Sequence, residues 1–320
     1  MTIGEHLREL GGLPAFDFPE PKDTRALPEA GSVAWRISVD VYGAEEEWQE
    51  VFARFADSVD TRAVRALIVG GWSEAYDTSN DALIEALAGA AGRFPALRAL
   101  FIGDVTFEEC EISWLQQSDM GPLLRAYPSL EEFGVRGGDG LLFPPVRHDA
   151  LRVLRIESGG LPREAVRGIA MSELPALTEL DLWLGTPEYG GDAEVADLEP
   201  FLTGVRLPAL RRLALHNSEI QNEIAGALAT APVVGRLEVL DLSMGVLDDE
   251  GVEALLAGGP LTHLTRLDLH HHYISEPLRE RICAALAPHG VEVDLGDHQV
   301  PDEDDVDEDG TAYRYIAVAE

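Results

Sequence analysis

Apolar residues recur along this chain in one local pattern, L-x-x-L-x-L, which returns every 21 to 33 residues. Within each copy, apolar and polar positions alternate, and this alternation predicts a short β-strand with one buried face. A pattern with this period indicates a solenoid of stacked units. The clearest copies begin at Leu97, Leu130, Leu151, Leu177, Leu210, Leu237 and Leu264, and looser copies begin at Ala34, Val64 and Gly290.

The stretch after several of these strands carries the signals of a helix. Asp248 is a good N-cap for a helix over 249–257, and Val252 and Leu255 fall on one side of that helix. Residues 221–230 and 278–287 have the same character. A unit of strand, turn and helix cannot bury its own apolar face, so we expect a curved parallel sheet with helices outside it.

Four copies extend to the spacing of a longer motif, L-x-x-L-x-L-x-x-N/C-x-L, although none of them has Asn or Cys at the ninth position. They lie at residues 151–161, 210–220, 237–247 and 264–274. With these motifs, residues 33–297 resemble the leucine-rich repeat family in its long, ribonuclease-inhibitor-like variety. The resemblance implies a single α/β horseshoe of about ten repeats, with parallel strands on the concave face and helices on the convex face. The usual Asn or Cys of the motif is replaced here by Gly159, Ser218, Gly245 and His272.

The whole chain also resembles a bacterial leucine-rich repeat family that has no assigned biochemical role. Genomes that encode members of that family encode radical-SAM-type proteins nearby. The resemblance therefore implies such proteins as candidate partners.

The two ends differ from the repeats. Residues 1–32 are rich in proline and lack the period, so we expect an extended segment before the solenoid. Residues 33–69 are expected to form an N-terminal cap with a helix over 45–58. Residues 298–320 are expected to form an acidic tail, of which 311–320 have the alternation of a strand.

Composition narrows the classes of function. The 320 residues include 58 acidic and 24 basic ones, a formal net charge of -34. Such a surface repels phosphate, so we expect neither a nucleic-acid ligand nor an anionic membrane. Only Cys110 and Cys283 are present, and their separation favours a reducing, cytoplasmic location over a disulfide scaffold.

Side chains that flank the last apolar positions of each copy are expected to project from the concave face. This face mixes arginines with acids and includes a tryptophan, the composition of a protein-binding hot spot. We therefore predict a non-catalytic interaction module or adaptor that binds a protein partner there. The predicted contact residues are Arg136, Arg155, Trp183, Arg212, His216, Asp241, Arg266 and His270.

Metal and catalytic sites find little support in the sequence. The side chains of the triple histidine 270–272 are expected to diverge on a strand and its exit turn, so no metal site is predicted. Nucleophile, phosphate-loop and zinc-protease motifs are absent, and neither an enzyme nor a cofactor is expected. Three alternatives stay open. They are binding of a small ligand or glycan beside Trp183, an enzyme with an unrecognised carboxylate and histidine site, and docking through the tail 311–320 itself.

Overall fold

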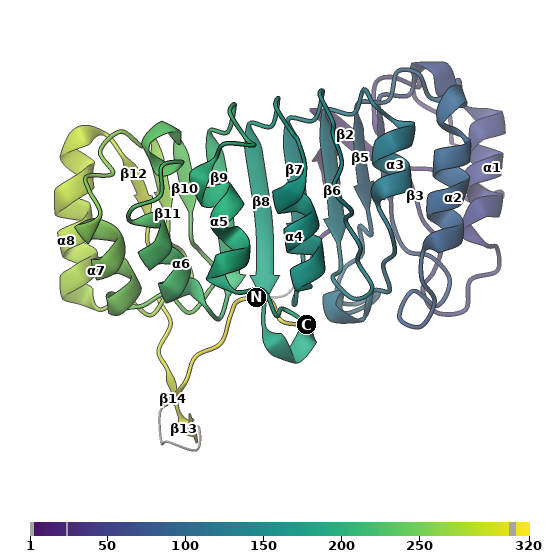
Figure 1. Cartoon of the computed structure of the whole chain (residues 1–320). Helices are drawn as coiled ribbons and strands as arrows, with labels where there is room; N and C mark the ends of the chain where they lie inside the picture. The colour runs from purple at the N-terminus through teal and green to yellow at the C-terminus, as the bar shows by residue number, and fades with distance from the viewer. Residues whose placement is uncertain (1–2, 24, 307–311) are drawn as a thin grey trace.

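The computed structural model of the chain is a curved solenoid with strands along one face and helices along the other (Figure 1). It describes residues 3–23, 25–306 and 312–320. The main sheet has 12 strands, arranged in the order of the sequence. Its first pair is antiparallel, and every later pair is parallel. The expected α/β leucine-rich repeat solenoid is therefore confirmed.

The strands of the main sheet are β1 (Glu9–Leu10), β2 (Leu13–Asp17), β3 (Ala34–Ile37), β4 (Ala66–Val69), β5 (Ala99–Ile102), β6 (Glu132–Arg136), β7 (Val153–Glu157), β8 (Glu179–Gly185), β9 (Arg212–Ser218), β10 (Val239–Asp241), β11 (Arg266–Asp268) and β12 (Glu292–Asp294). The helices are α1 (Trp48–Ser58), α2 (Asp81–Gly89), α3 (Gly121–Ala126), α4 (Arg163–Met171), α5 (Val195–Thr203), α6 (Gln221–Leu228), α7 (Asp249–Ala257) and α8 (Glu276–Leu286). Short 3-10 turns occupy Thr61–Ala63, Ala91–Arg93, Ile112–Trp114, Pro187–Tyr189, Val234–Arg236 and Ala287–His289.

The repeated leucines build one continuous core between the sheet and the helices. Leu180, Leu213 and Leu240 pair in register across β8, β9 and β10, and each is fully buried. Burying a leucine side chain contributes about 1.5–3 kcal/mol, and the column continues through most of the repeats. Each repeat therefore depends on its neighbours for the burial of its apolar face.

The helix layer follows the sequence signals. The helix expected over 249–257 is α7, and the Asp248 side chain accepts a hydrogen bond from the Glu250 N–H at 2.9 Å. The shortest repeat, between β6 and β7, connects its strands without a helix over the described residues 137–152. Among the described helices, none combines the length and the apolar character that crossing a membrane requires.

The N-terminal segment is part of the solenoid, which corrects the expectation of an extended segment outside it. Strand β2 pairs with β3 in parallel, and β1 folds back on β2 as a hairpin. Leu10 is buried on the concave face among Ala34, Ala66 and Ala99. Alanines at three aligned positions leave room for a second layer of chain, and this requirement is not visible in the period of the repeats.

The C-terminal region divides into a hairpin and a returning segment that forms no strand. β13 (Asp302–Val306) and β14 (Ala312–Tyr313) pair in an antiparallel hairpin that projects from the solenoid (Figure 1). Residues 314–320 then return to the solenoid, and the two described ends of the chain lie near each other (Figure 1). Part of the predicted tail, 307–311, lies outside the described residues.

The position of Leu10 gives a test of the N-terminal correction. We expect Leu10→Ala to lower the free energy of unfolding by about 2 kcal/mol, because a buried leucine loses its apolar contacts. Urea unfolding followed by circular dichroism measures this change. Leu27→Ala is the matched control, because Leu27 is exposed and its truncation should cost less than about 0.5 kcal/mol. Equal effects of the two substitutions would show that the segment does not pack on the sheet.

Candidate binding surface on the concave face

The parallel register arranges the concave side chains in rows that cross the strands. Position by position, Glu132 aligns with Val153, Glu179 and Arg212, and Gly134 aligns with Arg155 and Asp181. Side chains separated by a full repeat in sequence are therefore neighbours in space. These rows divide the concave face into an apolar half and an ionic half.

The apolar half lies over β3, β4 and β5, and the chain covers it itself. Ile68 and Phe101 are buried under the N-terminal segment together with Leu10. The peptide N–H of Gly11 donates to Glu132 of β6 at 3.0 Å, which anchors the end of the hairpin. This half is therefore closed to a partner in the described structure.

A buried chain of charges joins the two halves. The carboxylate of Asp104, which is fully buried, lies 2.7 Å from Arg36 Nε and 3.4 Å from Arg136 Nη1. Arg136 Nε in turn lies 2.7 Å from Glu157. Asp104 also accepts from the backbone N–H of Leu7 at 3.0 Å. The N-terminal segment is therefore bound by polar contacts as well as by packing.

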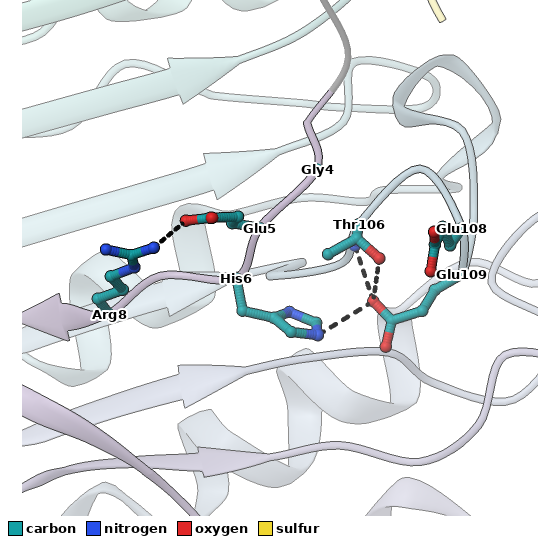
Figure 2. A pocket seen from close by; sticks show the side chains of 7 residues that line it. All are labelled: Gly4, Glu5, His6, Arg8, Thr106, Glu108 and Glu109. Carbon is teal, nitrogen blue, oxygen red and sulfur yellow. Dashed lines mark hydrogen bonds and ion pairs between the residues drawn. The ribbon is translucent and has the colours of Figure 1, made fainter.

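His6 completes this attachment from the other side. Figure 2 shows His6 pointing toward Glu109, which also accepts hydrogen bonds from Thr106. Hydrogen bonds with Asp104 and then with Glu109 raise the pKa of His6 to about 10. The imidazole is therefore positively charged at neutral pH and balances the two carboxylates.

The ionic half runs from β7 to β12 and presents three partly exposed arginines. Arg155 lies 3.4 Å from Asp181, Arg212 lies 3.6 Å from Asp241, and Arg266 lies 2.8 Å from Asp268. The side chains of the three arginines are 33%, 38% and 37% exposed, whereas their aspartate partners are buried. A buried acid therefore lies against each guanidinium group. Glu292 and Asp294 also pair with Arg266, and Glu179 lies 3.6 Å from Arg155 and 3.7 Å from Arg212.

His216 lies between two of these buried aspartates. Its Nε2 is 2.8 Å from Asp181 and its Nδ1 is 3.4 Å from Asp241. Burial opposes the charge on the ring, but the two carboxylates outweigh it and raise the pKa of His216 to about 10. Burial likewise opposes the charges on Asp181 and Asp241, and His216 outweighs it and lowers the pKa of both.

Ser243, His216 and Asp241 are the residue types of a Ser–His–Asp catalytic triad, but they are not arranged for proton transfer. Ser243 Oγ lies 3.2 Å from His216 Nδ1, but its hydroxyl donates to Asp241 at 2.6 Å. A general base must be neutral to accept a proton, and His216 is charged at neutral pH. The geometry therefore fits an internal ion pair rather than nucleophilic catalysis. The thiol of Cys110 is also a poor nucleophile, because burial and then Glu111 raise its pKa to about 11.

The predicted contact residues thus separate by depth. Arg136, His216 and Asp241 are buried, so they support the surface from within. Arg155, Arg212, Arg266 and His270 are partly exposed, and so is Trp183, whose ring meets that of His216 edge to face at 5.7 Å. All eight side chains therefore lie on the concave face of the sheet, and five of them are exposed enough to contact a partner.

Among the described residues, one group has the ligand types and spacing of a metal site, but an arginine already occupies it. Asp268, His270 and Asp294 have ligand atoms within 4.8 Å of one another. Arg266 already lies between the two carboxylates, 2.8 Å from Asp268 and 2.9 Å from Asp294. Its guanidinium supplies the positive charge that a metal would bring. The other two histidines of the triplet point elsewhere: His271 meets Tyr315, and His272 meets the carbonyl of Leu295.

Residues 315–320 lie across the ends of the strands at the rim of this surface, a position that the sequence did not predict. Val318 is held by Asn217, and Ala317 packs with Met244 and Ile112. Trp183 packs against the same cluster, so the returning segment covers part of the predicted hot spot. The alternation predicted strand character for 311–320, whereas in the described residues only Ala312–Tyr313 form a strand and 314–320 do not. No sequence signal indicated where 314–320 would lie.

Comparisons with known proteins support the fold and leave the function open. No protein-family model matches the chain, and no curated protein matches it. Its structure is similar to the crystal structure of a Bacteroides fragilis protein with a TM-score of 0.73 and 28% identity, over 79% of this chain and 71% of that one. An internalin from Listeria monocytogenes matches over 84% of this chain and 73% of that one, with a TM-score of 0.33 and 13% identity. A superposition of that quality carries no argument about function.

The charged His216 gives a pH-dependent prediction. We expect His216→Gln to lower the free energy of unfolding by about 3 kcal/mol at pH 6, because it leaves two buried carboxylates without their partner. The folded-state pKa of about 10 lies above the ordinary 6.5, so the stabilisation is complete below pH 6.5 and fades as the pH rises toward 10.

The cost of the substitution should therefore be smaller at pH 9.5 than at pH 6 in urea unfolding. His289→Gln is the control, because His289 is exposed. A cost that is the same at both pH values would mean that His216 is neutral in the folded protein.

Proposed function

We propose that this protein is a non-catalytic interaction module whose concave face, between β7 and β12, binds a protein partner. The direct contacts in this proposal are Arg155, Trp183, Arg212, Arg266 and His270. The buried residues Arg136, His216 and Asp241 hold this surface in place. A repeat solenoid offers such a concave surface for recognition.

One observation supports the proposal above the others, namely that three partly exposed arginines are held by buried acids on a rigid sheet. A free arginine loses much rotamer entropy when a partner fixes it. Here Asp181 and Asp241 lie 3.4 and 3.6 Å from Arg155 and Arg212, and Asp268 accepts a hydrogen bond from Arg266, so the acids restrict the positions of the guanidinium groups. The outer N–H groups are therefore oriented for acceptors before a partner arrives.

The charge of the chain supports a choice of partner. The formal net charge of -34 attracts a partner of opposite sign and raises its association rate at low ionic strength. Exposed acids such as Glu292 flank the arginines, so the face offers both signs at close spacing. We infer a protein segment that is basic overall and carries carboxylates or main-chain carbonyls where the arginines lie.

The proposal also includes the type of repeat, the location of the protein and a class of candidate partners. The long-repeat, ribonuclease-inhibitor-like type is supported by the strand and helix in most repeats. A reducing, cytoplasmic location is supported by the two cysteines, which are both free in the described structure. Radical-SAM-type proteins enter as candidate partners through family resemblance alone.

The test is a quantitative capture experiment from native lysate with full-length protein. We expect the variant Arg155→Glu, Arg212→Glu to lose at least 90% of the partner captured by the wild type, because reversed charge opposes the same contacts. Trp183→Ala alone should weaken capture about tenfold if the ring is a hot spot.

The matched control reverses the neighbouring arginines, Arg152→Glu with Arg211→Glu. These side chains are 60% and 46% exposed and pair with acids at 3.7 and 3.8 Å, outside the concave rows. Circular dichroism confirms that each variant is folded. Equal loss of capture in both double variants, or in neither, would contradict a concave binding surface.

A further inference from the structure

Three successive repeats share an unusual backbone conformation at equivalent positions. Asn217 lies near the end of β9, whereas Met244 and His271 follow β10 and β11, and their φ angles are 49°, 66° and 52°. Residues other than glycine adopt this left-handed region rarely, because the side chain crowds the backbone. The three positions lie side by side along the rim of the concave face.

Each of these residues holds one residue of the returning C-terminal segment, 314–320. The Asn217 side chain donates to the Val318 carbonyl at 2.6 Å and accepts from the Val318 N–H at 3.0 Å. The Met244 carbonyl accepts from the Ala317 N–H at 2.8 Å. His271 Nε2 lies 3.0 Å from the Tyr315 carbonyl. The segment therefore crosses the repeats one after another, in the reverse of their order in the chain.

The contact continues beyond these repeats. The Ser113 hydroxyl donates to the Ala319 carbonyl, and the Tyr189 hydroxyl donates to the side chain of Glu320. Gly159 lies directly beneath Ala319, and a Cβ atom at Gly159 would be 1.9 Å from the Ala319 carbonyl oxygen. The rim is therefore shaped for close approach of an extended main chain.

The segment 314–320 contributes mainly small or exposed side chains to its contact with the rim. Ile316, Ala317 and Val318 are buried, and Ala317 and Val318 join an apolar cluster with Ile112 and Met244. Tyr315 is 51% exposed, so its ring is not enclosed by the groove. Main-chain groups make most of the polar bonds, so the groove selects an extended conformation with two or three small apolar residues.

We propose that this rim groove, formed by Asn217, Met244, His271, Ser113 and Gly159, binds an extended segment of a partner protein, and that residues 314–320 are its intramolecular occupant. The partner segment has the chemistry of the resident segment, with small apolar residues at the Ala317 and Val318 positions. Departure of the resident segment also uncovers the side of Trp183 that faces the apolar cluster. This inference rests on the proposed function for its biological role and on the rim contacts for its site.

The resident segment, 314–320, lowers the apparent affinity of the groove for any external segment. A segment attached to the same chain competes at an effective concentration on the order of millimolar. An external segment therefore binds the small fraction of molecules in which the groove is open, and its apparent affinity falls by that fraction. A substitution that releases the resident segment should restore the full affinity.

The test uses full-length protein and a fluorescein-labelled synthetic peptide with the sequence of residues 312–320. We expect the Val318→Asp chain, in which a charge replaces a buried side chain of the resident segment, to bind the peptide at least tenfold tighter than the wild type in fluorescence anisotropy. Adding Asn217→Gly to that chain should weaken binding at least tenfold, because glycine keeps the left-handed backbone and removes both bonds to the Val318 position. Ala317→Pro, which removes the N–H that donates to Met244, is a second releasing variant if Val318→Asp fails to fold.

The control chain Val300→Asp carries the same substitution at an exposed site and should bind like the wild type. Equal binding to the wild-type and releasing chains would overturn the proposal, and so would no binding to a folded releasing chain. The peptide does not report on the arginine rows. Peptide binding together with unchanged capture by Arg155→Glu, Arg212→Glu would therefore refute the proposed function and leave the groove standing.

Discussion

Parallel pairing between successive strands places equivalent residues of neighbouring repeats beside one another, and the other features of this solenoid depend on that register. The leucines meet in columns beneath the sheet, and the concave side chains meet in rows above it. A one-residue slip of a strand would exchange the two faces. The same hydrogen bonds therefore fix both the core and the charge pattern of the candidate binding surface.

The ionic rows show how a strongly acidic chain can bury carboxylates. Asp104, Asp181 and Asp241 are buried from solvent, and each lies against two or three cationic groups from other elements. An isolated buried carboxylate would instead take up a proton or destabilise the fold. Charge pairing across repeats therefore satisfies these buried carboxylates, and the arginines beside Asp181 and Asp241 remain partly exposed at the surface.

The period of the leucines was enough to predict the fold class, and the Asp248 cap with the apolar residues after it predicted helix α7. The concave location of the site residues followed from alternation within each strand. Their depth did not, because burial of Arg136 and His216 depends on which acids stand in the neighbouring rows. The covering segments also escaped prediction. Leu10 sits on the concave face because three aligned alanines leave room for it, and Val318 is held by Asn217 across 101 residues of sequence.

The two covering segments also change how the solenoid must fold. In a simple repeat array each unit contacts only its neighbours, so terminal repeats fray and folding can begin anywhere. Here Ala319 contacts Ser113 across 206 residues, and Gly11 contacts Glu132 across 121 residues. Ile3 joins the same apolar cluster as Val318, so the beginning and the end of the described chain touch. These long-range contacts raise the contact order, which slows folding. They also connect repeats that are distant in sequence, so we expect the array to unfold more cooperatively than a simple repeat array.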